Sequence, residues 1–280
     1  MSEPGSSEQK NLSGLLVGLS VSESEDLARL GFAETHMRMV LGELARSLLL
    51  AGASILYGGR IDPNGYTDFL RREIERYGDR EGGLLVFLPW PAHRAMTLQE
   101  IATARSDLGI YGELVCLGTD GERVADDTDR GEDPPPGSKE EAADSLSAAR
   151  KKMVECAPVR ILAGGRRQGF VGHMPGVLEE ALLSIDAAQP LFLAGGFGGI
   201  TAGIATELGL DPDGVLPALG DPPPQLGEIA ARAEQAGWSP GDNTLDPQEN
   251  HRLAVSHRPS EVASLVLGGL RRLAPIHEGK

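Results

Sequence analysis

Short apolar runs alternate with stretches of helical periodicity along most of the chain. In the first half the apolar runs occupy residues 15–19, 54–57, 84–88 and 113–117, and helical patterns cover 35–50, 68–77 and 98–108. In the second half the runs occupy 159–163 and 190–194, and helical patterns cover 138–156, 176–187 and 200–208. A strand followed repeatedly by a helix is typical of a parallel sheet with helices on both faces. The pattern therefore predicts an α/β fold built on a doubly wound, mainly parallel sheet.

Segments without periodicity divide the chain. Residues 119–138 are rich in Asp, Glu, Gly and Pro, including Asp133-Pro134-Pro135-Pro136, a composition that cannot build a packed core. We expect a mobile, acidic, Pro-rich surface loop there. The polar start, residues 1–13, contains no signal-peptide core and is expected to be disordered. We expect one domain over 14–210, with residues 211–280 as its helical extension and helices at 226–236 and 261–273.

Three of the apolar runs end directly in a pair of glycines. The three turns are Gly58-Gly59-Arg60, Gly164-Gly165-Arg166 and Gly195-Gly196-Phe197-Gly198-Gly199. Glycine lets the backbone turn tightly and a ligand approach closely, and the helix that follows offers free N–H groups to an anion. Because the carboxyl ends of parallel strands meet at one edge of a sheet, we expect these turns to lie where ligands bind.

Composition narrows the class of ligand. The formal net charge of −15 argues against binding to nucleic acid or to an anionic membrane, because both need a basic surface. A bound nucleotide remains compatible with this charge, since local arginines and helix dipoles can oppose it. The two cysteines, Cys116 and Cys156, lie in or beside apolar segments without metal-ligand spacing, so we expect reduced core residues and no metal site. With no apolar run long enough to span a bilayer, we expect a cytoplasmic protein.

Polar side chains near the turns each have two interpretations. Arg60 and Arg166 could each clamp a phosphate with two hydrogen bonds, or they could be solvated loop residues. Ser20 and Ser22, in the expected loop after the first run, could bind phosphate or ribose, or they could only shape a turn.

Aromatic residues and one histidine follow the same turns. Tyr66 after Gly65 and Phe170 after Gly169 could stack on a base or ribose, or could anchor their loops to the core. His173 is better explained as an ordinary loop histidine, because no Ser or Cys nucleophile motif accompanies it. A dehydrogenase is disfavoured, because no turn has the full GxGxxG spacing with an acidic residue about 20 positions on.

The most specific stretch runs from a helix into the second glycine turn. The helix carries Ala149-Arg150-Lys151-Lys152-Met153, a strand follows, and Gly164-Gly165 lead through Gly169 and Pro175-Gly176 to Glu179-Glu180. This arrangement resembles the LOG family, whose members carry an Arg-Lys-x-x-Met helix, a strand and a Pro-Gly-Gly-x-Gly-Thr-x-x-Glu motif. LOG and DprA-like proteins define the SLOG superfamily of Rossmann-like nucleotide-binding domains. The first half, Leu19 to Tyr77, more closely resembles SLOG domains of bacterial conflict and signalling systems.

This resemblance covers most of residues 15–209 and implies roles for matching positions. Arg150 falls where the family places its helix arginine, although Met153 is one position closer than that pattern's methionine. Glu180, or alternatively Glu179, falls where the family's glutamate opens the helix. In the enzymes, this pair is implicated in polarising the ribose as the N-glycosidic bond breaks. The loop before Glu180 is several residues longer than the family motif, which favours binding over catalysis.

Two function classes therefore stay open. The resemblance implies a sensor domain for a nucleotide or NAD-derived ligand, similar to ADP-ribose or its cyclic forms, in bacterial defence. Such a domain would be a homo-oligomer with an effector protein as a candidate partner. The alternative is an N-glycoside-cleaving nucleotide hydrolase, of phosphoribohydrolase or NAD-glycohydrolase type, with Arg150 and Glu180 as catalytic residues. Neither class requires a cofactor. The candidate ligand-binding residues are Ser20, Ser22, Gly58, Gly59, Arg60, Gly65, Gly164, Gly165, Arg166, Gly169, Pro175, Gly176, Glu179, Gly195, Gly196, Phe197, Gly198 and Gly199.

Overall fold

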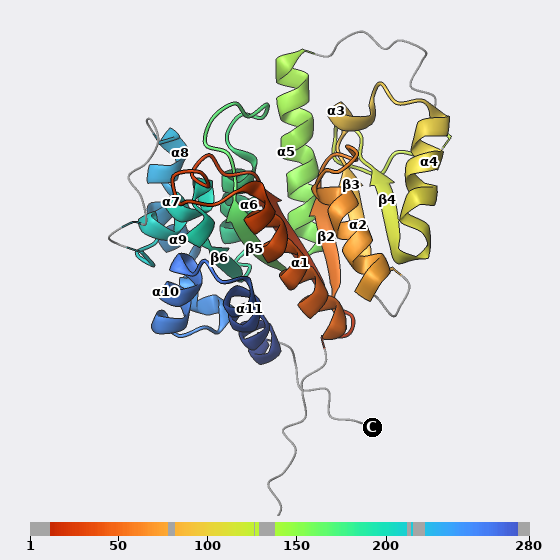
Figure 1. Ribbon diagram of the computed structural model, residues 1–280. Coiled ribbons are helices and arrows are strands. Elements are labelled where there is room, and N and C mark those ends of the chain that lie inside the picture. Colours follow the sequence, from red (N-terminus) through yellow and green to blue (C-terminus); the bar gives the residue numbers. More distant parts are fainter. Residues whose placement is uncertain are drawn as a thin grey trace, which may run out of the picture.

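A single parallel sheet forms the centre of the molecule (Figure 1). The computed structural model describes residues 12–77, 82–125, 127–128, 138–211, 214 and 222–273. Its strands are β1 (Leu16–Ser22), β2 (Ser54–Gly58), β3 (Leu84–Leu88), β4 (Gly112–Cys116), β5 (Val159–Gly164) and β6 (Leu191–Ala194). Their order across the sheet is β4-β3-β2-β1-β5-β6, and each neighbouring pair is parallel. The expected doubly wound, Rossmann-like α/β fold is confirmed.

Helices cover both faces of this sheet (Figure 1). One face packs against α1 (Glu34–Leu50), α2 (Tyr66–Tyr77), α4 (Leu98–Leu108) and α11 (Pro259–Leu273) in one core cluster that includes residues of every strand. The other face packs against α5 (Lys139–Cys156), α6 (Gly176–Asp186), α7 (Gly199–Glu207) and α9 (Ile229–Ala236). Shorter segments are α3 (Trp90–His93), α8 (Pro224–Gly227), η1 (Gly109–Tyr111), η2 (Gly195–Phe197) and η3 (Pro240–Asn243).

The first strand is longer than its sequence suggested. We expected it to end at Leu19, with Ser20 and Ser22 in a loop, and this expectation is wrong: β1 pairs with β5 as far as Ser22 opposite Gly164. Val17, Leu19 and Val21 enter the core beneath α1, so the residues between them face α5 and α6. Ser20 and Ser22, which resembled part of a polar loop, therefore occupy alternate positions of β1, on the polar face of this strand.

Most other elements have nearly the expected bounds. Ser138 caps α5, as its sequence predicted, because its Oγ accepts a hydrogen bond from Glu141 N at 3.0 Å. The helix expected over 226–236 is interrupted at Glu228, which separates α8 from α9. Among the described residues two α-helices were missed, the four-residue α3 and α10 (Pro247–Val255), although the start of α10 has a recognisable signal. Asp246 accepts from the backbone N of Glu249 at 2.8 Å, and proline occupies the first helical position.

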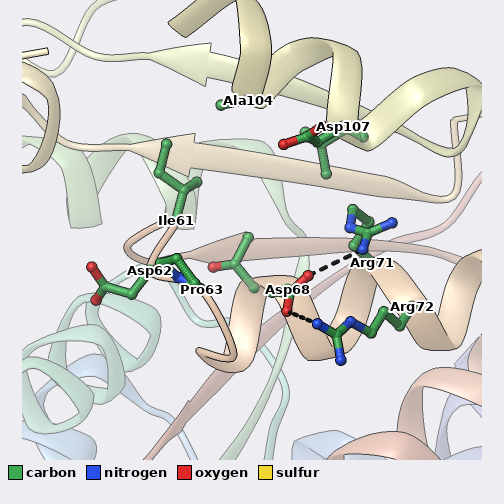
Figure 2. Close-up of a pocket in the computed structure, with 10 residues that line it drawn as sticks. Ile61, Asp62, Pro63, Asp68, Arg71, Arg72, Ala104 and Asp107 are labelled. Carbon is green, nitrogen blue, oxygen red and sulfur yellow. Dashed lines mark hydrogen bonds and ion pairs between the residues drawn. The ribbon is translucent and has the colours of Figure 1, made fainter. Parts of the chain in front are cut away.

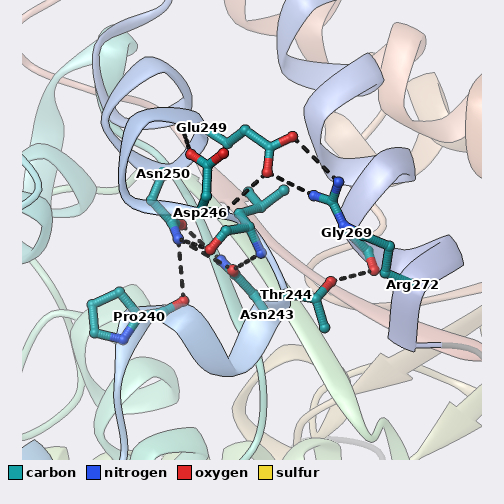
Figure 3. Close-up of polar contacts among 9 residues, drawn as sticks. Pro240, Asn243, Thr244, Asp246, Glu249, Asn250, Gly269 and Arg272 are labelled. Atoms are coloured by element: carbon teal, nitrogen blue, oxygen red, sulfur yellow. Dashed lines mark hydrogen bonds and ion pairs between the residues drawn. The ribbon is translucent and has the colours of Figure 1, made fainter.

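Buried amides attach the C-terminal helices to the sheet edge. Figure 3 shows the contacts of these amides among the C-terminal residues themselves. Asn243 donates from Nδ2 to the carbonyl of Leu191 on β6 and to Oδ1 of Asn250 on α10, both at 2.8 Å. Thr244 Oγ1 donates to the carbonyl of Gly269 on α11 at 2.9 Å. Because α11 also packs along α1, these contacts join the C-terminal helices to the main core.

Several expectations concern residues outside the described part of the chain. They include the disorder of the N-terminus, for residues 1–11, and half of the acidic loop, at residues 126 and 129–137. Both remain predictions. Among the helices of the described residues, none combines the length and apolar character needed to cross a membrane.

Candidate functional site

A cleft of about 430 Å³ opens at the carboxyl ends of β1, β2 and β5. The direction of strand succession reverses between β1 and β5, and ligands of open parallel sheets bind at such a reversal. Residues from distant parts of the chain line this cleft. Those singled out from the sequence are Ser20, Ser22, Gly58, Gly59, Arg60, Gly65, Tyr66, Arg150, Arg166, Gly169, Phe170, Gly176 and Glu180.

Glu180 presents a carboxylate to the cleft from the first turns of α6. Its Oε2 accepts hydrogen bonds from Ser20 Oγ and from Arg160 Nη1, the latter at 2.7 Å. Among the described residues nothing donates a hydrogen bond to Oε1, and Arg150 Nε lies 4.0 Å from it. One carboxylate oxygen is therefore held by the protein, and the other is available to a ligand that donates a hydrogen bond.

Arg160 lies behind Glu180 and is completely buried, with 0% of its surface exposed. Its guanidinium packs against Gly18, where an added Cβ would lie only 3.0 Å from Cζ. Burial lowers the pKa of Arg160 below the usual arginine value, although the neighbouring Glu180 acts in the opposite direction. We missed this residue at the level of sequence. Its signal was a single charge inside the otherwise apolar strand Val-Arg-Ile-Leu-Ala-Gly of β5.

Arg150 is paired mainly with the other candidate glutamate. Its Nη1 donates to Glu179 Oε2, and Ser147 Oγ donates to Glu179 Oε1. Glu179 does not line the cleft, whereas Arg150 and Glu180 do. Of the two alternatives for the family's glutamate, Glu180 is the one that presents its carboxylate to the cleft.

Two arginines follow the strands that flank β1. Arg60 comes after β2 and pairs with Asp62, with Nε 2.9 Å from Oδ2, and Arg166 comes after β5 and pairs with Glu23. Both pairs are well exposed, and exposed ion pairs are weak, at about 0–1 kcal/mol. A phosphate could therefore exchange with either carboxylate at little cost.

A carboxylate already occupies the backbone donors of the second glycine turn. Glu25 Oε1 accepts from the amides of Arg167 at 2.9 Å and Gln168 at 3.3 Å. The adjacent Asp26 is buried and accepts from Arg167 Nη1 at 2.6 Å and from the amide of Gly199 at 2.8 Å. Burial alone would raise the pKa of Asp26, but these hydrogen bonds and the charge of Arg167 lower it overall. The turn binds anionic groups, and acidic residues after β1 supply them.

One side of the cleft is apolar and open to solvent. Phe170 is 40% exposed and Val171 64% exposed, and both belong to the loop after the second glycine turn. Across β1, Arg38 lies over the Tyr66 ring, with Cζ 5.4 Å from its centroid. The buried hydroxyl of Tyr66 makes no hydrogen bond within the described residues, and burial raises its pKa. These rings and the valine offer surface for a flat, apolar group.

Other candidates lie outside the cleft lining. Two glycines of the second turn and the whole third turn are buried: Gly164, Gly165, Gly195, Gly196, Phe197, Gly198 and Gly199. Pro175, which directly precedes α6, does not line the cleft either. The amide of Ile200 donates to the carbonyl of Gly165 at 2.9 Å, so the second and third turns pack on each other. Phe197 packs near Phe32 and His257. His173 also lies outside, where its Nε2 is 2.7 Å from Asp144 Oδ1 on the surface.

A second cavity, of about 250 Å³, lies between α2 and α4 and shares Asp62 and Thr67 with the cleft (Figure 2). Its two arginines, Arg71 and Arg72, both pair with Asp68, at 3.1 and 2.7 Å. Arg71 also pairs with Glu75, and Asp62 and Asp107 add two carboxylates to the lining, so this cavity offers less to an anion than the cleft does.

Comparisons with known proteins identify the family. A family model described as SLOG cluster2 matches residues 11–219. Neither the curated proteins nor the solved structures gave a match. In the described part of the chain, no group of three or more His, Cys, Asp or Glu side chains is placed to hold a metal ion. The matched residues contain the whole sheet and every side chain that lines the cleft, and the protein therefore belongs to the SLOG superfamily, whose domains are nucleotide-related.

Proposed function

We propose that the cleft binds a nucleotide or NAD-derived ligand, such as ADP-ribose, and that the protein is a sensor domain in a bacterial defence or signalling system. One observation carries this proposal. The cleft combines two exposed arginines, Arg60 and Arg166, with the carboxylate of Glu180 at the reversal of a parallel sheet. Guanidinium groups suit phosphates, and a carboxylate suits the hydroxyl groups of a ribose.

A ligand with more than one phosphate would fit the two arginines well. Arg60 follows β2 and Arg166 follows β5, so they flank the end of β1 from both sides. Each can release its weak carboxylate partner and form two parallel hydrogen bonds with a phosphate. A pyrophosphate lying across the end of β1 would engage both.

The base of such a ligand would then contact the apolar side of the cleft. Phe170 offers a ring for stacking, and an aromatic stack adds about 1–3 kcal/mol per base. Solvent-exposed apolar side chains at a cleft mouth favour burial by a ligand, because their contact with water is unfavourable.

Calorimetry against ADP-ribose, NAD and cyclic ADP-ribose isomers tests the proposal. We expect micromolar or tighter binding that Arg166→Ala weakens, because a charge-assisted pair to phosphate is lost. Arg232→Ala is the matched control, since Arg232 is an exposed arginine paired with Asp186 away from the cleft. Phe170→Ala should weaken ADP-ribose but not ribose 5-phosphate, which has no base. If the wild-type protein binds none of the three ligands, the sensor proposal is wrong.

Cleavage of an N-glycosidic bond is the second candidate, and it has its own supporting observation. Glu180 Oε1 faces the cleft without a hydrogen-bond partner among the described residues, and Arg150 lies beside it. A carboxylate so placed can stabilise the positive charge that develops on a ribose when its base leaves. Incubation with NAD or nucleoside monophosphates, followed by chromatography, should then show a free base whose release Glu180→Ala abolishes. Equal inertness of both proteins would exclude this activity for those substrates.

The sensor proposal also includes self-association and an effector partner. Sedimentation velocity with and without ADP-ribose would show whether ligand binding changes the oligomeric state. A sedimentation coefficient that stays that of a monomer in both conditions would contradict self-association.

A further inference from the structure

The face of the sheet beneath α5 and α6 is divided by polar residues. One apolar cluster on this face joins β5 and β6 to α6, α7 and α9, and a separate one joins β2, β3 and β4 to α5. Neither cluster includes Gly18 and Ser20 of β1, Arg160 of β5 or Glu180 of α6, which meet at the border between β1 and β5. We call these four residues the polar seam. Only Ser20 and Glu180 of the seam reach the cleft.

The polar seam is costly for a structure that served stability alone. Arg160 is fully buried, and its Nε and Nη2 make no hydrogen bond within the described residues. Unpaired buried donors destabilise a fold, and apolar residues of similar volume often replace buried ion pairs without loss. Gly18 adds to this cost, because a strand packs less well without a side chain. The cost is concentrated directly behind Glu180.

We propose that Arg160 is a positioning residue, which together with Ser20 fixes Glu180 so that Oε1 faces the cleft as the acceptor for a ribose hydroxyl. The inference rests on the proposed function, since it assumes that the ligand contains a ribose. Arg160 Nη1 reaches both Ser20 Oγ, at 3.0 Å, and Glu180 Oε2, at 2.7 Å. With Oε2 engaged by two donors, rotation of the carboxylate is restrained and Oε1 is left for the ligand. Gly18 provides the space in which the guanidinium lies.

The test compares two ligands that differ only in ribose hydroxyls, AMP and 2′,3′-dideoxy-AMP, by calorimetry, with ADP-ribose as a third probe. A hydrogen bond to a charged acceptor predicts that the wild-type protein binds AMP roughly ten- to hundredfold more tightly than the dideoxy ligand. Arg160→Met should bring the ratio of the affinity for AMP to that for dideoxy-AMP close to one. It should leave the affinity for the dideoxy ligand almost unchanged. A merely structural role would weaken both ligands equally and leave the ratio intact.

Three further variants keep the test independent of whether Arg160→Met folds. Gly18→Ala retains the charge but must displace the guanidinium, because the new Cβ would lie 3.0 Å from Cζ and 3.2 Å from both terminal nitrogens. Gly18→Ala should therefore lower the ratio of the two affinities only partly. Arg160→Lys should keep a larger ratio than Arg160→Met does, since a cation remains. Glu180→Ala removes the acceptor and should bring the ratio close to one, and Arg160→Met should change nothing further in that background.

The outcomes separate this inference from the proposed function. A ratio that is lost in Glu180→Ala but unchanged in Arg160→Met and Gly18→Ala would overturn the role of Arg160. Equal binding of AMP and dideoxy-AMP by the wild-type protein would overturn the inference but leave nucleotide binding intact. If the wild-type protein binds none of the three probes, the proposed function fails and the inference fails with it.

Discussion

The second glycine turn offers a test of why its glycines are needed, because two of them have similar backbones and different surroundings. Gly165 has φ +90° and Gly169 has φ +67°, both in the left-handed region. A Cβ on Gly165 would lie 2.5 Å from Ile200 Cγ2 on α7 and 3.0 Å from Val177 Cβ on α6, whereas a Cβ on Gly169 would meet no atom within 4 Å. Alanine at either position should pay the left-handed penalty, which is about 1–2 kcal/mol. Only Gly165→Ala should add the cost of overpacking, about 1–3 kcal/mol.

We therefore expect Gly165→Ala to destabilise the protein by about 2–5 kcal/mol and Gly169→Ala by about 1–2 kcal/mol. Urea unfolding followed by the fluorescence of Trp90 and Trp238 gives both free energies of unfolding, provided that the dependence on urea is the same for all three proteins. Equal destabilisation by the two substitutions would refute the conclusion that packing against α6 and α7, rather than a ligand, requires a glycine at position 165.

Three further predictions concern other parts of the molecule. Glu25→Gln should increase the affinity for ADP-ribose measured by calorimetry, because it removes a negative charge from the backbone donors of the second turn; a lower affinity would show that Glu25 supports the ligand site instead. Asp26→Asn should cost about 3 kcal/mol or more at neutral pH, since it leaves the buried Arg167 without its anion. Because the folded-state pKa of Asp26 is lowered, the wild-type advantage should be complete above about pH 4 and disappear as the pH falls through the folded-state pKa, and an advantage that does not change with pH would contradict this. Asn243→Ala should lower the free energy of unfolding by about 2–3 kcal/mol by leaving buried backbone groups unpaired, while Ser239→Ala, at an exposed cap, should cost less than about 1 kcal/mol; equal costs would show that the buried amide contributes nothing special.

Local sequence determined much of this protein. The alternation of apolar runs and helical patterns predicts the class of sheet, and the caps and glycine turns predict where most elements begin and end, because both depend on neighbours within a few residues. Glycine pairs mark the carboxyl ends of β2 and β5, which are two sides of the cleft. The sequence singles out Arg60, Arg150, Arg166 and Glu180 as candidates, and the structure brings them to one cleft.

Only the tertiary structure decided which of the glycine turns face that cleft. The third turn repeats the signal of the other two, but α10 and the second turn pack over it, and no pattern along the chain records that contact. The same holds for Arg160, which is close to Ser20 and Glu180 only because β5 pairs with β1 and α6 packs on that face. A lone charge in a strand indicates that something unusual is buried there. Its partners depend on contacts between residues 20 and 140 positions apart, and the folded chain alone creates these contacts.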